Sequence, residues 1–125
     1  MLYQALIVGI GGFFGAIFRN LTLVLFNVKF GLTSPYGVLF VNTLGSLLAG
    51  IFIGVVSWSS NIYLKLFFVT GFLGAYTTFS AFSIDNLELL KSQEYKLVFL
   101  NIVSNIVLTL VFVIIGYAVT KKIIG

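Results

Sequence analysis

Four long apolar runs account for most of this sequence and leave only short polar connections between them. They cover residues 2–26, 37–56, 64–90 and 97–119, and the third fades from about residue 82 onward. A hydrocarbon core about 30 Å thick is crossed by roughly 20 apolar residues in a helix. Only 8% of the 125 residues are charged, whereas soluble domains carry about a quarter. The sequence therefore predicts an all-α membrane protein of four transmembrane helices in one domain, residues 1–125.

Several residue types that carry chemistry are missing or misplaced for an enzyme or a cation pump. The chain has no cysteine and no histidine, which removes disulfides, imidazole catalysis and most transition-metal sites. The only acids are Asp85, Glu88 and Glu94, so the first, second and fourth runs contain none. Proton-coupled and cation transporters usually need a carboxylate inside the membrane. We predict no enzyme, and a permeant species that is an anion or a neutral solute.

The position of the basic residues predicts neither a signal peptide nor a nucleic-acid-binding segment. The N-terminus lacks a basic region before its apolar run, so we interpret that run as the first spanning helix and not as a signal peptide. The seven basic residues are scattered along the chain. Basic residues that flank apolar spans anchor helices at the membrane surface, so no nucleic-acid partner is predicted.

The basic residues are almost evenly divided between the two sides of the predicted bundle. Four spans place Lys65, Lys121 and Lys122 on one side, and Arg19, Lys29, Lys91 and Lys96 on the other. Orientation follows the side that is richer in lysine and arginine, and here the difference is a single charge. We therefore predict insertion in both orientations and an antiparallel, dual-topology homodimer. A weakly biased single orientation is the alternative.

Small and polar residues recur every four positions on the first two spans. Asn42, Ser46, Gly50 and Gly54 share one face of the second span, and Gly11, Gly15 and Arg19 share one face of the first. Faces of small residues let membrane helices approach closely, so these stripes predict helix packing. Arg19 is costly in hydrocarbon; it either lies in a wet vestibule or reaches the membrane surface from the end of its helix.

The fourth span carries uncharged hydrogen-bonding groups at the same spacing. Asn101, Asn105 and Thr109 form one polar stripe, and an unpaired amide in hydrocarbon is expensive. Hydrogen bonds between helices would satisfy them. They would also suit a hydrated track, where fixed neutral donors replace the water of a small anion without trapping it. No separate role is assigned to Asn101 and Asn105.

The third span contains the densest set of unusual residues. Gly74 followed by Tyr76, Thr77 and Thr78 is poor helix sequence, which predicts a break in mid-membrane. Such a break is tolerated where it is buried in protein or lines a cavity, and its freed carbonyls could coordinate a hard cation such as Na⁺.

Two phenylalanines follow this break. Phe79 and Phe82 are three residues apart and share a face, with Ser80 and Ser83 beside them. Aromatic rings have a positive edge, so rings presented edge-on can attract an anion. Packing is the alternative role for both phenylalanines.

At this point the sequence resembles the Fluc fluoride channel family, also called CrcB. The resemblance covers essentially the whole chain and rests on residues 15–19, 41–46 and 70–83. It implies passive fluoride export across the inner (plasma) membrane by an antiparallel dimer with two pores. Two positions depart from the family pattern: Val113 stands where relatives can carry a hydroxyl, and Asp85 stands where glutamate is common.

The resemblance also implies roles for individual residues. Fluoride would pass Asn42, Phe79 and Phe82 along a track that includes Ser80, Ser83 and Thr109. A structural Na⁺ on the two-fold axis would be held by the backbone carbonyls of Gly74 and Thr77. Arg19 would lie near a vestibule or support packing.

Two other functions are compatible with the length and the number of spans. A small dual-topology multidrug exporter needs a membrane-embedded glutamate in its first helix, and residues 2–26 contain none. A non-transporting membrane scaffold would explain the small-residue stripes but not the Phe79 and Phe82 pair.

Overall fold

The structure of the protein is a computed structural model, which describes residues 1–31 and 34–125. Every described element is helical. In chain order they are α1 (Leu2–Phe30), α2 (Tyr36–Ser59), α3 (Ile62–Leu64), the π-helical η1 (Lys65–Leu73), α4 (Gly74–Tyr76), α5 (Phe79–Lys91) and α6 (Tyr95–Ile124). Four segments are long and apolar enough to cross a membrane: Leu2–Phe30, Tyr36–Ser59, Ile62–Lys91 and Tyr95–Ile124. The prediction of an all-α protein with four such helices is confirmed; Ile62–Lys91 is called the third span below.

The helices extend beyond the apolar runs that predicted them. The first connection, expected between the apolar runs 2–26 and 37–56, begins later than those runs suggest, because α1 continues through Phe30. It ends at Gly31, whose φ of 64° lies in the left-handed region and whose N–H donates to the Asn27 carbonyl over 2.7 Å. Glycine adopts this conformation without the steric cost of a Cβ atom. Residues 32 and 33 of the predicted connection lie outside the described residues.

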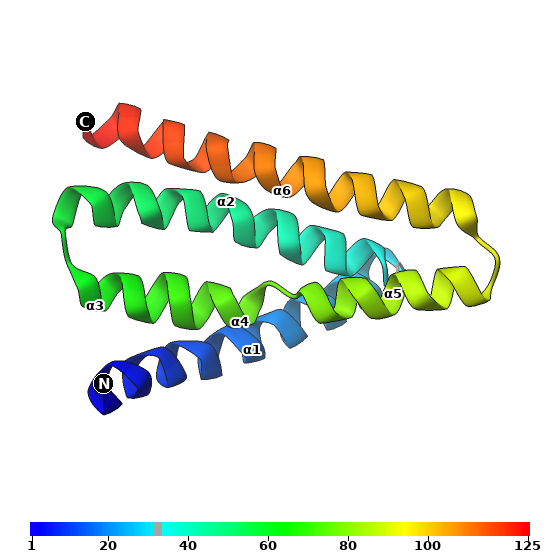
Figure 1. The fold of residues 1–125 in the computed structure, drawn as a ribbon, viewed down its shortest axis with the longest axis horizontal. Helices are drawn as coiled ribbons and strands as arrows, with labels where there is room; N and C mark the ends of the chain where they lie inside the picture. The colour runs from blue at the N-terminus through cyan, green and yellow to red at the C-terminus, as the bar shows by residue number, and fades with distance from the viewer. Residues whose placement is uncertain (32–33) are drawn as a thin grey trace.

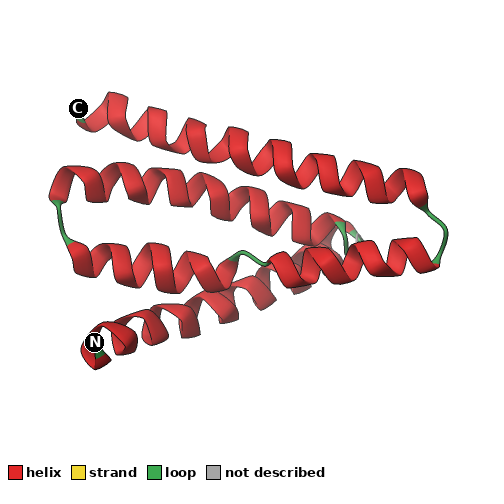
Figure 2. Cartoon of the chain, in the orientation of Figure 1, coloured by secondary structure: helices red, strands yellow, loops and turns green. Residues whose placement is uncertain are grey.

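The four long segments lie side by side, and the two termini lie at the same end as the turn between α2 and α3 (Figure 1). The opposite end holds the α5–α6 turn, and Figure 2 shows that helices make up nearly all of the chain. α6 packs on α2, and α1 packs on η1 and α4. The third span therefore lies between α1 and α2, where both can hold it.

Glycines set the distance between the paired helices. A Cβ atom at Gly11 or Gly15 would collide with the backbone carbonyl of Phe67 or Phe72, respectively. On the other side of the bundle, a Cβ atom at Gly50 would collide with the Val113 carbonyl. These contacts confirm that the small-residue stripes of the first two spans pack helices closely, as small faces do in membranes.

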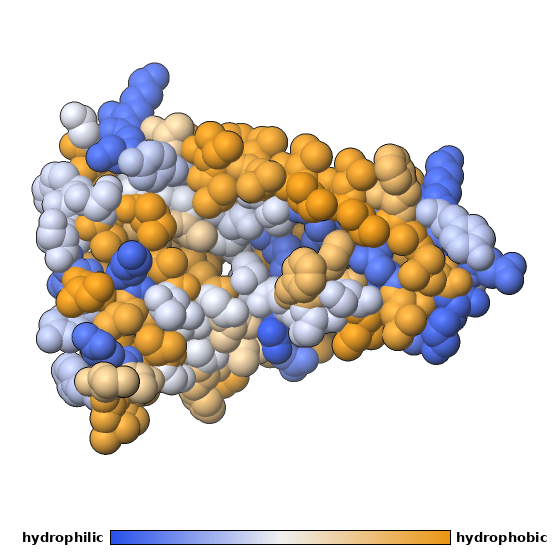
Figure 3. Space-filling view, viewed as in Figure 1, coloured by the Kyte–Doolittle hydropathy of each residue, from blue (hydrophilic) through white to orange (hydrophobic). Residues whose placement is uncertain are grey.

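The outer surface of the bundle is mostly apolar. Large hydrophobic side chains are exposed along α1, α5 and α6, and Figure 3 shows apolar atoms over much of one face with hydrophilic atoms gathered at both ends. The same view shows a more polar band between α6 and the third span. An apolar exterior with a polar strip inside it is the arrangement expected when lipid replaces water around the protein.

Candidate functional site

The third span contains a two-residue interruption formed by Thr77 and Thr78. α4 ends at Tyr76 and α5 begins at Phe79. Thr77 has φ −77° and ψ 156°, and Thr78 has φ −149° and ψ 119°, so both are extended. The Thr78 side chain then caps α5 by accepting a hydrogen bond from the N–H of Ala81 over 3.1 Å. A threonine at this position satisfies one of the N–H groups that a helix start leaves without partners.

Asn42 on α2 holds the interruption from one side. Its Oδ1 accepts a hydrogen bond from the Thr78 N–H over 2.8 Å, and its Nδ2 donates to the Thr78 carbonyl over 3.1 Å. Nδ2 also donates to Asn105 Oδ1 on α6 over 3.2 Å. Because a backbone N–H can only donate, the atom that faces the Thr78 N–H must be the oxygen of the amide, Oδ1. Both N–H groups of Asn42 are therefore bonded inside the protein.

α1 holds the interruption from the other side. Arg19 Nη1 donates to the Ala75 carbonyl over 3.0 Å, and the Tyr76 hydroxyl donates to Thr22 Oγ1 over 3.2 Å. In a continuous helix the Ala75 carbonyl would accept from Phe79, beyond the interruption. A guanidinium near the last carbonyls of a helix also complements their partial negative charge. This contact favours the packing role that was predicted for Arg19 as one of two alternatives.

A cavity of about 470 Å³ opens beside the interruption. Its lining residues come from α2, the interruption, α5 and α6, and all ten are uncharged: Asn42, Ser46, Thr77, Thr78, Phe79, Phe82, Ile102, Asn105, Ile106 and Thr109. We call it the polar cavity. Neutral donors and acceptors in such a space can replace water around a small ion without binding it irreversibly.

The structure brings four of the six predicted pore residues together in the polar cavity. Asn42, Phe79, Phe82 and Thr109 line it, whereas Ser80 and Ser83 are not among its lining residues. Ser83 donates to the Phe79 carbonyl over 3.0 Å, and the hydroxyls of Ser80 and Thr78 lie 3.2 Å apart. Both serines thus satisfy local backbone or capping groups at the start of α5. Arg19 is not among the lining residues either.

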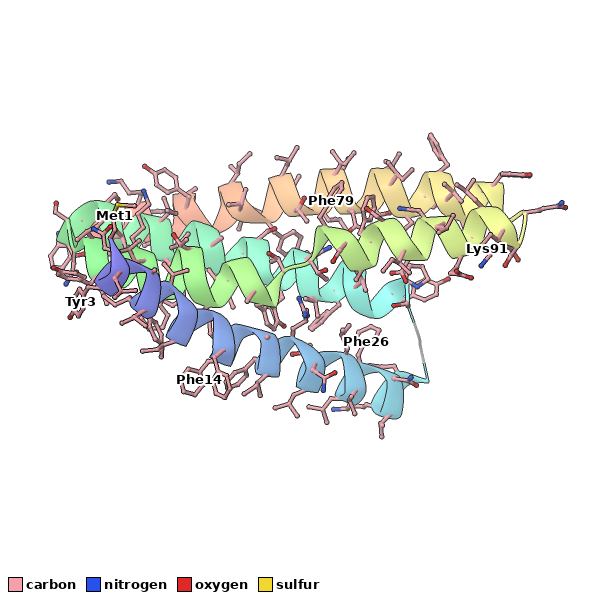
Figure 4. All side chains as sticks on the ribbon, turned by 60° about the horizontal axis from the view of Figure 1, so that its bottom comes forward. Met1, Tyr3, Phe14, Phe26, Phe79 and Lys91 are labelled. Carbon is pink, nitrogen blue, oxygen red and sulfur yellow. The ribbon has the colours of Figure 1, made fainter. Side chains whose placement is uncertain are left out.

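Phe79 and Phe82 form a tilted pair, with ring centroids 5.2 Å apart and ring planes at 46°. They differ in exposure: 8% of the surface of Phe82 is exposed, against 78% of that of Phe79. Figure 4 shows Phe79 beside α6, where Ile102, Ile106 and Thr109 supply the facing wall. A tilted pair presents ring edges as well as faces to its surroundings, so one wall of the cavity is aromatic and partly uncovered.

Three polar residues that line this cavity were not predicted as site residues from the sequence. Ser46, Thr78 and Asn105 line it. Ser46 could have been found, since it lies one turn after Asn42 on the same stripe. Asn105 lies one turn before Thr109, whose hydroxyl donates to the Asn105 carbonyl. Thr78 could be recognised only with the exact position of the interruption.

The carbonyls of Gly74 and Thr77 have lost the partners that a continuous helix would give them. The N–H of Thr78, four residues after Gly74, donates to Asn42 instead, and the N–H of Ala81, four residues after Thr77, donates to Thr78 Oγ1. Gly74 is exposed, and an added Cβ would meet only the Val69 carbonyl, at 3.8 Å. Carbonyl oxygens are suitable ligands for a hard cation, so these residues fit the predicted cation.

Comparison with known proteins gives consistent results over the whole chain. Residues 6–117 match the family model for CrcB-like protein, Camphor Resistance (CrcB). A Campylobacter lari protein named fluoride-specific ion channel FluC is 46% identical, with 97% of this chain and 100% of the relative covered. Proteins of the same name from Campylobacter jejuni and Legionella pneumophila are 45% and 41% identical, covering 97% and 95% of this chain and 100% and 90% of the relatives.

These relatives are named as ion channels, not as enzymes. The family model matches residues 6–117, which include two of the four apolar helices completely and most of the other two. The resemblance recognised in the sequence is therefore confirmed, and the chain is a multi-pass membrane protein that belongs to the CrcB family.

Proposed function

We propose that this protein is a fluoride-selective channel that exports fluoride passively and lowers its cytoplasmic concentration. The observation that carries the proposal is the polar cavity, whose ten lining residues offer amides, hydroxyls and aromatic rings but no charge. The name of the relatives, fluoride-specific ion channel FluC, supports the choice of ion. We place the protein in the inner (plasma) membrane, where export from the cytoplasm takes place.

Selectivity in this proposal comes from replacing the water around a small, strongly hydrated anion. Several fixed neutral donors can do this while binding weakly enough to release the ion. The rings of Phe79 and Phe82 supply their positive edges. The amide of Asn42 and the hydroxyl of Thr109 supply donors once each gives up an acceptor inside the protein, which for Thr109 is the Asn105 carbonyl. Ser80 and Ser83 remain predicted members of the track next to the cavity.

Asn42 can donate to fluoride only if fluoride replaces one of its present acceptors, since both of its N–H groups are already bonded. Of its two donated bonds, the one to the Asn105 side chain is the longer, at 3.2 Å. A hydrogen bond to an anion is roughly twice as strong as one between neutral groups. We therefore propose that fluoride replaces Asn105 as acceptor while the two bonds between Asn42 and Thr78 keep the amide in place.

The proposed assembly is an antiparallel homodimer of two oppositely inserted chains, with the interruption of each third span in mid-membrane. The nearly even division of basic residues, three against four, supports dual insertion. Phe79 is 78% exposed beside a polar cavity, so a second chain would complete the wall. Two-fold symmetry repeats the cavity, which gives two pores in each dimer.

We further propose that Na⁺ is held between the two chains by the Gly74 and Thr77 carbonyls. When bound, Na⁺ would offset the partial negative charge of carbonyls that lack helical N–H partners. Its role is structural: it would hold the interruptions of the two chains against each other. Prolonged exchange of Na⁺ for a larger organic cation is expected to reduce fluoride efflux, and unchanged efflux would contradict the Na⁺ site.

The function is tested with purified protein in liposomes that are loaded with fluoride or chloride and have no proton gradient. The proposal predicts that fluoride leaves quickly and that chloride is retained. Fluoride retention equal to that of protein-free liposomes would overturn the proposal. Proton flux stimulated by drugs would instead indicate the multidrug exporter, and the absence of any flux would indicate a scaffold.

A further inference from the structure

Four buried asparagine side chains form a continuous hydrogen-bonded row that starts at the polar cavity. Asn42 Nδ2 donates to Asn105 Oδ1 over 3.2 Å, Asn105 Nδ2 donates to Asn101 Oδ1 over 3.0 Å, and Asn101 Nδ2 donates to Asn86 Oδ1 over 3.1 Å. Asn86 Nδ2 then donates to the Phe82 carbonyl over 3.0 Å. Each side chain is at most 9% exposed. We call this row the asparagine relay.

The backbone fixes the direction of the relay. At one end, the N–H of Thr78 must face Asn42 Oδ1; at the other end, the Phe82 carbonyl must face Asn86 Nδ2. In the middle, the Asn101 carbonyl accepts from Asn105 Nδ2 over 2.9 Å. Backbone N–H groups only donate and carbonyls only accept, so no side chain in the relay can turn over without losing a bond.

The fixed direction decides what Asn105 presents to the polar cavity. Both N–H groups of Asn105 donate to Asn101, to its carbonyl and to its Oδ1. The oxygen of Asn105 faces the amide of Asn42. Asn105 is therefore held as an acceptor for the same N–H that the proposed function offers to fluoride.

We propose that Asn101 and Asn86 are positioning residues that keep Asn105 in place as a resident competitor for the Asn42 N–H. This inference rests on the proposed function. When fluoride leaves, Asn105 takes the N–H back, so Asn42 is not left with an unsatisfied buried donor, which is costly. A pore needs binding that is weak enough to release the ion, and a competitor weakens binding without adding charge.

The proposal predicts that two measured quantities, the half-maximal fluoride concentration and the maximal efflux, fall together. Loosening Asn105 with Asn101→Leu or Asn86→Leu weakens the competition for the Asn42 N–H. Fluoride then binds more tightly and leaves more slowly. We expect the fluoride concentration at half-maximal efflux to fall by about threefold to tenfold, and the maximal efflux to fall with it, as expected for the loss of one hydrogen bond. Asn101→Leu, which touches Asn105 directly, has the larger effect.

The experiment measures efflux from liposomes over a range of fluoride concentrations, with the thermal stability and dimer content of each variant. The double variant Asn86→Leu/Asn101→Leu replaces both partners with apolar groups and so leaves no unpaired amide between them. It is expected to regain stability while its half-maximal concentration remains low. The matched control is Thr120→Val, which removes a buried hydroxyl that donates to the Gly116 carbonyl over 2.9 Å on the far part of α6.

The outcomes separate this inference from the proposed function. A half-maximal concentration that matches the wild type and the Thr120→Val control in all relay variants would overturn the relay and leave the channel intact. Recovery of both stability and half-maximal concentration in the double variant would also overturn it, because the relay would then be structural only. Wild-type liposomes that retain fluoride would overturn both the channel and the relay.

Discussion

Phe82 lines the polar cavity and is almost completely covered, whereas Phe79 one turn earlier is mostly exposed. Replacing Phe82 with isoleucine keeps an apolar side chain but removes the ring edge. If that edge attracts fluoride, Phe82→Ile is expected to lower efflux by about fivefold, since edge contacts of rings contribute on the order of 1 kcal/mol each and a factor of ten needs about 1.4 kcal/mol. Efflux from liposomes and the dimer content by size-exclusion chromatography check this prediction.

The control for this prediction is Phe52→Ile. Phe52 stacks on Phe68 with centroids 4.6 Å apart, and neither residue lines the polar cavity. It therefore removes one ring of an aromatic pair without touching the proposed pore. Wild-type efflux in Phe82→Ile, or an equal loss in Phe52→Ile, would remove the ring edges from the mechanism.

At the residue scale, sequence patterns located side chains better than they located contacts. The spacing of Phe79 and Phe82 and the stripe that begins at Asn42 indicated residues that do line one cavity. Asn86 was not predicted, because it follows the charged Asp85 where the third span loses its apolar pattern. Its partner Asn101 is fifteen residues away across the α5–α6 turn, and a single sequence carries no signal for such a pair.

At the scale of the helices, α1 and the third span pack closely, and a substitution at Gly15 tests what sets their separation. A Cβ atom at Gly15 would overlap the Phe72 carbonyl, so Gly15→Ala has to move α1 away from the third span. Overpacking of this kind typically costs about 1–3 kcal/mol. We expect a lower unfolding temperature in detergent and lower efflux, because α1 also carries the Arg19 contact to Ala75.

Gly9 on the same helix provides the matched control, because nothing lies within 4 Å of an added Cβ there. Alanine also favours helix over glycine by about 1 kcal/mol, so Gly9→Ala is expected to keep or slightly raise the unfolding temperature. Equal stability of the two variants would show that the separation of α1 and the third span is not set by Gly15.

At this scale the sequence predicted the number and pairing faces of the helices but not their ends. Apolar runs report where lipid requires hydrophobic residues, whereas helix ends depend on local capping. α1 continues through Lys29 to Phe30 because Gly31 provides the left-handed end. The interruption at Thr77 and Thr78 depends on Asn42, which replaces the missing helical bonds from a different helix.

Orientation in the membrane is a property of the whole molecule. With three basic residues on one side and four on the other, insertion has almost no charge bias. Reporters fused to the C-terminus are expected to give signals from both sides of the membrane. Extra lysines appended after Gly125 should shift the population toward one orientation and reduce the amount of dimer.

A reporter signal from one side only would rule out dual insertion. The antiparallel dimer would then lose its main support, and the exposed Phe79 would need another cover. Because both termini lie at the same end of the bundle (Figure 1), a reporter at the N-terminus should agree with the C-terminal one in either case.

Selective conduction of fluoride is the central claim, and the reversal potential of the current in a planar bilayer tests it most directly. Chloride is kept equal on both sides, and fluoride is set in a tenfold gradient. The account predicts a reversal potential close to the fluoride equilibrium value, about 59 mV for a monovalent ion. A reversal potential near zero, where chloride is at equilibrium, or the absence of any current, would contradict it.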